Sequence, residues 1–302
     1  MGSEGVRRSI SHGERRDPLD RVKRLVLVAL FSDEDLTDLL VLKGGNALDI
    51  AYGIALRSSL DIDFSLPGEF ILPLPQIRSK LEACLTSTFA HHDLTVFDVT
   101  LEARPKQVKG ELAKFWGGYR AHFKVIEHSK YATLSGNVDE LRKHAMMLGP
   151  NGRFQIEFSR HEYCAEKEIV NVDGTHISVY TPEMLVAEKL RAICQQMSEY
   201  ARVVKSHPTS RARDFVDIVN LIDAFSIDMT LPAPRALIEC CFAAKRVPLE
   251  LLNVVSTTRD FHRPGFALVR DTYRPGARLD DFDRYFDQVS DLCGRLEPFW
   301  HK

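Results

Sequence analysis

The sequence lacks the features of several common protein classes. Its six cysteines include no Cys-x-x-Cys pair, and Cys240 and Cys241 are adjacent, which argues against a zinc site or a disulfide framework and favours a reducing compartment. No stretch approaches the roughly 20 apolar residues of a membrane span, and the charged first 20 residues lack the apolar run of a signal peptide. We therefore expect a cytoplasmic protein with no membrane partner.

The chain also lacks an excess of charge of one sign. Its formal net charge is −2, so the molecule as a whole does not attract nucleic acid, and any such attraction must be local. Two nucleotide-binding signatures are missing as well, because no Gly-Lys-Ser/Thr follows a glycine loop and no Gly-x-Gly-x-x-Gly occurs. With 44% hydrophobic residues, a chain of 302 residues can still bury a substantial core.

The order of hydrophobic patterns predicts an α/β (α+β) fold. Residues 1–16 carry charge and few apolar side chains, so we expect a disordered tail there. Residues 17–180 contain a mixed β-sheet core flanked by helices, with strands expected at 40–43, 60–66, 94–102, 119–127 and 153–159 and helices at 20–31, 32–40, 46–55 and 73–90. Residues 181–302 form a helical C-terminal domain, beginning with helices over 181–196 and 213–225.

A glycine turn and a pair of aspartates are the first candidate functional residues. Gly44 and Gly45 follow a short buried strand and precede a helix for which Asn46 is the expected N-cap, so phosphate oxygens could approach backbone N–H groups there. In the strand over 60–66, Leu60, Ile62 and Phe64 alternate with Asp61 and Asp63, which predicts that both carboxylates share one face. Two such carboxylates suit a magnesium ion, although an Asp-x-Asp alone also fits a solvated strand face.

Together these residues resemble a known family. The stretch LKGGNALDIAYGIALRSSLDIDFSL is similar to the first motif of the DNA polymerase beta type nucleotidyltransferase superfamily, in its AbiEii/AbiGii toxin branch, which shows K-G-G-[TN]-A-L followed by R-x-S-x-D-[IL]-D-F. The resemblance implies a nucleotidyltransferase core over 17–180. It also implies that the nucleotide is bound by Lys43, Gly44, Gly45, Asn46, Arg57 and Ser59, with Arg213 added by the second motif.

That second motif lies about 125 residues further on. LVAEKLRAI and SRARDFVDIVNLI resemble the E-K-x-x-A and R-x-x-D-x-x-D helices of the branch, and the similarity assigns catalytic roles to Asp61, Asp63, Lys189 and Asp214. Lys189 would be a mobile cation for the triphosphate, and Asp214 would accept a proton from the attacking hydroxyl or orient it. Asp217 equally fits an ordinary i,i+4 pair with Arg213.

The superfamily often has a third carboxylate on a later strand. Glu157 alternates with Phe154, Ile156 and Phe158, and it is the candidate that would join Asp61 and Asp63 as a metal ligand; Asp98 is the rival. A solvent-facing position would equally explain Glu157.

The resemblance implies a Mg²⁺-dependent enzyme, with Mn²⁺ as a substitute, that transfers NMP from an NTP to an acceptor hydroxyl. For this toxin branch the acceptor is an RNA, a tRNA 3′ end, and a cognate antitoxin is the expected partner. Basic residues interleaved with aromatic ones over 104–130, and a second basic stretch over 202–213, fit either phosphate binding or solvated loops. Nucleotidylation of a protein or small molecule, and a catalytically silent nucleotide-binding or partner-binding module, remain the alternatives.

Overall fold

A single seven-stranded sheet organises the first half of the chain, and helices make up the second. The computed structural model describes residues 17–54, 59–205, 207–274 and 276–300. Its strands are β1 Val41–Lys43, β2 Ile62–Ser65, β3 Leu94–Arg104, β4 Gly118–Glu127, β5 Phe154–Ser159, β6 Glu168–Val172 and β7 Thr175–Val179. The predicted 1–16 tail lies outside the described residues.

The helices follow the same chain order. Before and between the strands lie α1 Pro18–Phe31, α2 Glu34–Leu39, α3 Gly44–Asn46 with a π-helical turn Ala47–Ala51, α4 Leu74–Ala90, α5 His128–Leu134 and α6 Val138–His144. The described elements after β7 are all helical: α7 Pro182–Cys194, α8 Ala212–Phe225, α9 Pro232–Ala244, α10 Arg259–His262, α11 Phe266–Thr272, α12 Phe282–Leu296 and several short 3₁₀ turns. None of the described helices is long and apolar enough to cross a bilayer.

The sheet is mixed, as the sequence predicted. Its strands lie in the order β3-β4-β5-β2-β1-β7-β6. The pairs β1/β2, β3/β4, β4/β5 and β6/β7 are antiparallel, whereas β2/β5 and β1/β7 are parallel. The central strands β5, β2 and β1 therefore come from three separate parts of the chain.

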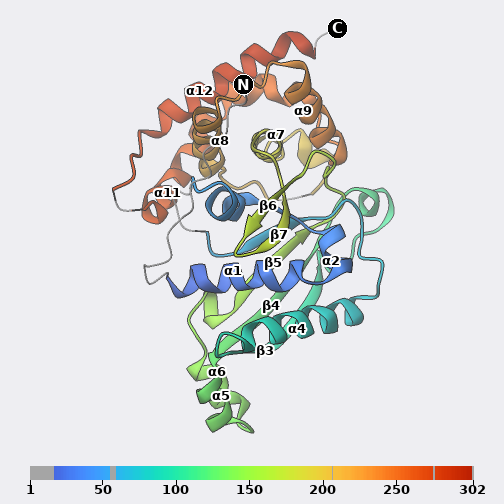
Figure 1. The fold of residues 1–302 in the computed structure, drawn as a ribbon. Coiled ribbons are helices and arrows are strands. Elements are labelled where there is room, and N and C mark those ends of the chain that lie inside the picture. The colour runs from blue at the N-terminus through green and yellow to red at the C-terminus, as the bar shows by residue number, and fades with distance from the viewer. Residues whose placement is uncertain (1–16, 55–58, 206, 275, 301–302) are drawn as a thin grey trace, which may run out of the picture.

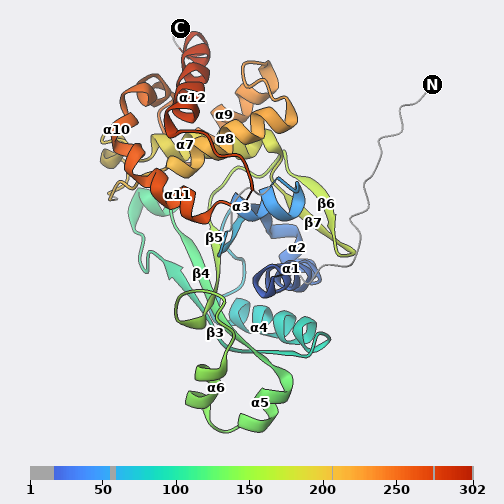
Figure 2. The same ribbon diagram turned by 90° about the vertical axis from the view of Figure 1, so that its left-hand side faces the viewer.

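Helices α1 and α4 cover one face of this sheet (Figure 1). The ring of Phe31 on α1 lies 6.0 Å from that of Phe64 on β2, and Phe89 on α4 lies 6.0 Å from Phe123 on β4. Because neighbouring side chains on a strand point to opposite faces, the residues next to Phe64 and Phe123 point to the other face. That face turns toward α7, α8 and α11 (Figure 2).

Local signals position the helices. Asp17 accepts a hydrogen bond from Leu19 N and caps α1, and the Thr181 hydroxyl accepts one from Met184 N with Pro182 at the first position of α7. Helix α2 begins at Glu34, within the predicted range 32–40, and the side chain of its N-cap Asp33 accepts a hydrogen bond from Leu36 N.

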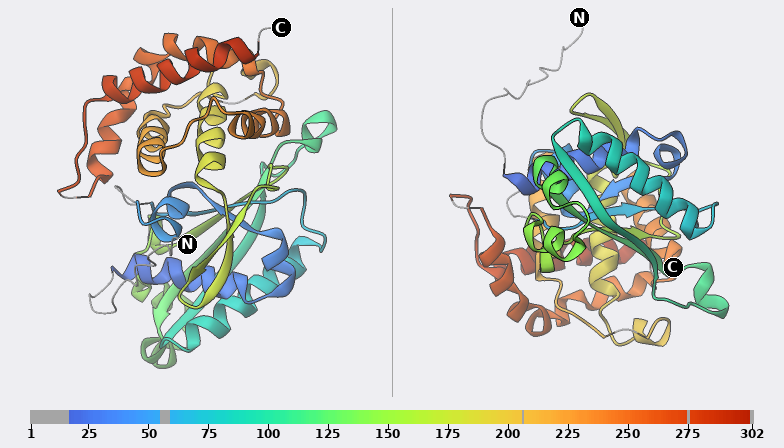
Figure 3. Two further views of the ribbon diagram at one scale, coloured as in Figure 1. Left: turned by 45° about the horizontal axis from the view of Figure 1, so that its top comes forward. Right: turned by 90° about the horizontal axis from the view of Figure 1, so that it is seen from below.

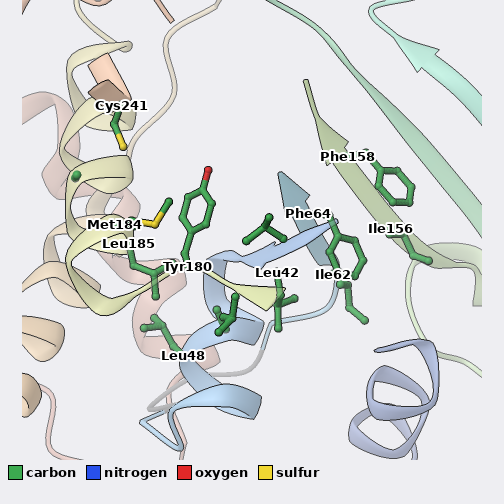
Figure 4. Close-up of a cluster of buried hydrophobic side chains, with 14 of the residues drawn as sticks. Leu42, Leu48, Ile62, Phe64, Ile156, Phe158, Tyr180, Met184, Leu185 and Cys241 are labelled. Atoms are coloured by element: carbon green, nitrogen blue, oxygen red, sulfur yellow. The ribbon is translucent and has the colours of Figure 1, made fainter. Parts of the chain in front are cut away.

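The apolar core continues from the sheet into the C-terminal helices. Figure 4 shows Ile62, Phe64 and Ile156 of the sheet in one cluster that reaches Met184 and Leu185 of α7. The C-terminal helices are stacked against the sheet at the end of the molecule opposite α5 and α6 (Figures 1 and 3). One continuous apolar core thus joins α7 to the sheet.

Candidate functional site

Four charged side chains lie in register across the middle of the sheet. Lys43 on β1 pairs with Asp63 on β2, Asp63 pairs with Glu157 on β5, and Glu157 pairs with Arg120 on β4. Directly paired residues share a face, and alternation with Phe64 and Ile156 directs this row away from the core. The sheet thus brings residues 43, 63, 120 and 157 side by side.

Gly44 allows the backbone to pass close to Asp63. Its φ is +69°, in the left-handed region that side chains other than glycine rarely adopt, and a Cβ built on it would lie 2.7 Å from Asp63 Oδ2. The second glycine, Gly45, completes the turn into the helix. Gly44 is therefore required by the approach of the turn to the carboxylate.

The segment before β2 and the role of Asn46 differ from the sequence prediction. Asp63 lies within β2, but Asp61 precedes the strand, and Leu60 is 49% exposed instead of facing the core. Asn46 is not an N-cap, since the helix begins at Gly44; its fully buried side chain donates a hydrogen bond to the Asp61 carbonyl oxygen. Asn46 thus braces the loop before β2, and it is not among the residues that line the cavity described below.

The two aspartates are held in surroundings that disfavour their charge. Burial, together with Glu157, Glu188 and Asp61, raises the pKa of Asp63 to about 7 even though Lys43 opposes the shift. Burial and Glu157 also raise the pKa of Asp61, against the effect of Arg120, His122 and Arg213. The carboxylates repel one another, and nearby cations do not fully compensate them.

Glu157 is engaged within the sheet. Its Oε1 accepts hydrogen bonds from Arg120 Nη2 at 2.7 Å and Nε at 3.1 Å, and from Gln155 Nε2 at 2.8 Å. The rival, Asp98 on β3, forms a bidentate pair with Arg142 of α6, at the far end of the molecule from the C-terminal helices. Only Glu157 of these two lies beside Asp63.

Lys189 and Asp214 meet as the second motif implied, but Lys189 is buried in ion pairs. Lys189 Nζ lies 3.1 Å from Asp214 Oδ1 and 2.7 Å from Asp217 Oδ2, with the lysine side chain 4% exposed. Lys189 is therefore a buried clamp between α7 and α8 and not a mobile cation. Asp217, left open between function and a pair with Arg213, is a partner in this clamp.

Asp214 remains a carboxylate of low basicity. Burial alone would raise its pKa, but Arg211 and Lys189 outweigh burial and lower it. Arg211 Nε lies 2.7 Å from Asp214 Oδ2. A carboxylate with a lowered pKa is a weak proton acceptor, so an orienting role fits Asp214 better than that of a general base.

These groups converge on one cavity of about 620 Å³. Its lining includes Lys43, Asp63 and Glu157 of the sheet, and Lys189, Arg213 and Asp214 of α7 and α8. Gly44 and Gly45 after β1 and Ser59 before β2 line it as well, together with other residues. Gly265, Leu268 and Val269, at and near α11, also line it, which sequence reasoning did not foresee. Asp61 is not among the lining residues, and Arg57 lies outside the described residues.

A buried ring of charges beneath the cavity also escaped sequence reasoning. Lys43 Nζ lies 3.4 Å from Glu162 Oε1 and 3.6 Å from Glu188 Oε1, and Arg191 bonds Glu162 at 2.6 Å and Glu188 at 3.2 Å. Lys245, just after α9, adds a contact of 3.4 Å to Glu162. Glu188 precedes Lys189 in the second motif and so carried a signal, but Glu162 and Lys245 belong to no motif.

The donor set suits a hard divalent cation without forming a complete cage. No group of three His, Cys, Asp or Glu side chains is arranged to hold a metal ion within the described ranges. Asp61, Asp63 and Glu157 nevertheless offer oxygen donors whose mutual repulsion a cation would relieve. Magnesium commonly binds through one or two carboxylates, with water and substrate phosphate as its other ligands.

Comparison with known proteins adds independent information. The family model described as "Nucleotidyl transferase AbiEii toxin, Type IV TA system" matches residues 25–288. No curated protein matches the chain. Among solved structures, JHP933 from Helicobacter pylori is 15% identical with a TM-score of 0.49, covering 93% of this chain and 91% of that chain. An antigenic nucleotidyltransferase-like protein from Paracoccidioides brasiliensis is 14% identical with a TM-score of 0.34, covering 76% and 93%.

Proposed function

This chain belongs to the AbiEii nucleotidyl transferase toxin family, and from that premise we propose that it is a Mg²⁺-dependent enzyme that transfers NMP from an NTP to an RNA hydroxyl. Family membership itself makes the chain a nucleotidyltransferase of the type IV toxin–antitoxin class. The metal, the acceptor and the residue roles are the proposed part.

The observation that carries the proposal is the convergence of two distant motifs on one cavity. Gly44, Gly45 and Asp63 reach it from the sheet, and Lys189 and Asp214 reach it from helices more than 120 residues later. A polyphosphate site needs backbone N–H groups, cations and metal-binding carboxylates within a few ångströms of one another. The cavity offers all three.

Each residue then has a defined task. The Gly44–Gly45 turn leaves room for phosphate oxygens next to Asp63, and the exposed Arg213 is placed to donate to them. Asp61, Asp63 and Glu157 would hold the magnesium, which neutralises charge on the triphosphate. Lys189 fixes Asp214 at the cavity wall, where that carboxylate orients the acceptor hydroxyl.

The reaction requires little covalent chemistry from the protein. The acceptor oxygen forms a bond to the α-phosphorus, the bond from that phosphorus to the β-phosphate oxygen breaks, and pyrophosphate leaves. The protein contributes alignment and electrostatic stabilisation.

RNA is the proposed acceptor, with a tRNA 3′ end as its form. The family description supports a toxin role and a cognate antitoxin as partner. Part of the predicted basic segment supports RNA, because Arg104, Trp116 and Arg120 line a second cavity next to the first.

Incubation with labelled NTPs, magnesium and either total tRNA or total protein tests this function. We expect label in tRNA, and labelling about a thousandfold slower when Asp63 is replaced by asparagine. Label that enters only protein or a small molecule would establish the alternative acceptor and refute the RNA proposal. Absence of transfer to any acceptor in magnesium and in manganese would favour a silent binding module.

Magnesium should stabilise the folded protein, independently of turnover. Because a cation relieves the repulsion among Asp61, Asp63 and Glu157, 10 mM Mg²⁺ is expected to raise Tm by about 2 °C if its Kd is about 1 mM. Thermal unfolding at pH 8, with and without the ion, measures the shift. Asp63→Asn should abolish it, and an equal shift in both proteins would place the ion elsewhere.

Gly44→Ala should cost about a hundredfold in transfer rate, because the new Cβ displaces the Asp63 carboxylate. Gly53→Ala is the matched control: Gly53 has φ +67°, close to the +69° of Gly44, but nothing lies within 4 Å of its added Cβ. Both variants should lose about 1 kcal/mol of stability from the left-handed backbone. Equal activities of the two variants would show that Asp63 is not displaced or does not matter.

A further inference from the structure

A second cavity of about 330 Å³ adjoins the first. The residues that line both cavities are Lys43, Glu157, Ser159, Glu188 and Arg211. Away from this shared wall the two cavities have different lining residues. Gly44, Gly45 and Arg213 line only the first, whereas Arg104, Trp116 and Lys245 line only the second. Lys43 on β1 and Glu157 on β5 thus lie between the two cavities.

The two compartments differ in charge. In the first, the basic residues Lys43, Lys189, Arg211 and Arg213 are matched in number by the acidic residues Asp63, Glu157, Glu188 and Asp214. In the second, only the acidic residues Glu157, Glu162 and Glu188 face the basic residues Lys43, Arg104, Arg120, Arg191, Arg211 and Lys245. Arg104 and Arg211 are paired with carboxylates outside this lining, Glu102 and Asp214, so the second cavity has a modest excess of positive charge where the first has none, and it favours an anion.

An aromatic ring borders the same cavity. Trp116 is half-buried, and Lys245 Nζ lies 6.0 Å from the centre of its ring. Lys245 is held in place at 3.3 Å from the Phe115 carbonyl oxygen and 3.4 Å from Glu162 Oε1. Cations beside an aromatic face form the combination that binds a nucleotide by its phosphate and its base.

The direction of attack connects the second cavity to the reaction. In phosphoryl and nucleotidyl transfer the attacking and leaving oxygens lie roughly in line on opposite sides of the phosphorus. With the triphosphate against Gly44, Gly45 and Arg213, pyrophosphate leaves through the first cavity. The acceptor hydroxyl, which Asp214 orients at the first cavity, approaches the α-phosphorus from another side. The wall that both cavities share, at Lys43, Glu157 and Arg211, lets the strand that carries this hydroxyl continue into the second cavity.

We propose that the second cavity binds the terminal nucleotide of the RNA acceptor, with its phosphate against Arg104 and Arg120 and its base against Trp116. The inference rests on the proposed function and specifies where the acceptor binds. A volume of about 330 Å³ is at the lower end of the range for ligand pockets, which fits one nucleotide and not a folded protein surface.

Arg104→Gln tests the phosphate contact. Arg104 is 45% exposed and pairs with Glu102, so its replacement should not disturb folding. Arg78→Gln is the matched control, since Arg78 is 41% exposed, pairs with Glu82 and lines neither cavity. The measurement is the Kd of a labelled single-stranded oligoribonucleotide, by fluorescence anisotropy at several salt concentrations, with a DNA strand of the same sequence in parallel.

We expect Arg104→Gln to weaken oligoribonucleotide binding about tenfold and to reduce the salt slope by about 0.7, the value for one lost phosphate contact on a single strand. Trp116→Leu should weaken binding similarly with an unchanged slope, because stacking releases no counterions. Arg78→Gln should bind as the wild type does. The KM for NTP should stay the same in Arg104→Gln.

The proposal would be overturned if Arg104→Gln left both the RNA affinity and its salt slope unchanged, or if Arg78→Gln lost as much RNA affinity as Arg104→Gln. It would also be overturned if Arg104→Gln raised the KM for NTP and did not weaken RNA binding. Equal affinity for the DNA strand would keep the cavity as a nucleotide site but remove its selectivity for RNA, and so would overturn the assignment to an RNA end. Failure of the proposed function is distinguishable, because it appears as absent NMP transfer in the wild type whereas these binding measurements need no turnover.

Discussion

Asp63→Asn is expected to lower the rate of nucleotidyl transfer by about a thousandfold, roughly 4 kcal/mol of transition-state stabilisation, while the protein remains as stable as the wild type. Asparagine keeps the shape of the side chain but removes the negative charge that would hold the metal. Asp63 lines the cavity, lies against Gly44 and is flanked by Lys43 and Glu157 in register. No other described carboxylate combines these positions.

The unchanged stability expected for Asp63→Asn follows from the electrostatics of the site. Burial and neighbouring carboxylates raise the pKa of Asp63 to about 7, so its charged form is not what holds the fold together. Removing the charge should therefore leave Tm in metal-free buffer unchanged or slightly higher. Steady-state kinetics and thermal unfolding on the same preparation measure both parts.

Asp98→Asn is the control for this variant. Asp98 lies on a strand, pairs with Arg142, and occupies a left-handed conformation with φ 55° that asparagine tolerates. Its transfer rate should match the wild type, whereas Glu157→Gln should lose activity if Glu157 completes the metal site. Transfer by Asp63→Asn within tenfold of the wild type would remove the carboxylate from the mechanism.

Glu162→Gln is expected to destabilise the protein by about 3–5 kcal/mol, the range for breaking a buried ion pair. The Glu162 side chain is 4% exposed and lies within 3.4 Å of Lys43 and Lys245 and within 2.6 Å of Arg191. Burial alone would raise the pKa of Glu162, but Arg191, Lys43 and Lys245 hold it well below its ordinary range. Glutamine would leave these three buried cations without their common counter-charge.

Urea unfolding at pH 7 measures the loss, with Glu82→Gln as the control. Glu82 pairs with Arg78 on the surface of α4, where an ion pair contributes about 1 kcal/mol or less. Because the folded-state pKa of Glu162 is depressed, its stabilisation is present above the ordinary pKa of 4.5 and is lost as the pH falls below that value. The difference between wild type and Glu162→Gln should therefore shrink in acid. A loss of stability no larger than that of Glu82→Gln would show that the buried ring of charges does not stabilise the folded protein.

Short-range patterns were sufficient for most elements of the fold. Alternation of apolar and polar residues predicted the strand that became β2, and β-branched and aromatic content predicted β3, β4 and β5. The Thr181 cap and Pro182 mark the start of α7. These signals are local, since they depend on periods of two or 3.6 residues and on groups within one turn of the chain. Of the motif residues, Gly44, Asp63, Lys189 and Asp214 line the cavity, whereas Asn46 and Asp61 do not.

The sequence by itself determined the central elements, the family and the two motifs, but it did not predict strands β6 and β7. Only the tertiary structure decided what each side chain contacts: Asn46 turned inward to Asp61, Lys189 was buried between two aspartates, and Glu162 became the centre of a charge ring that includes Lys245. Such partners lie from 15 to 83 residues apart, and those of Lys189 and Lys245 meet only when the helices that carry them pack into the fold. Burial and neighbouring charge set the pKa and mobility of each group. Both arise only from that packing, and no periodic sequence pattern reports them.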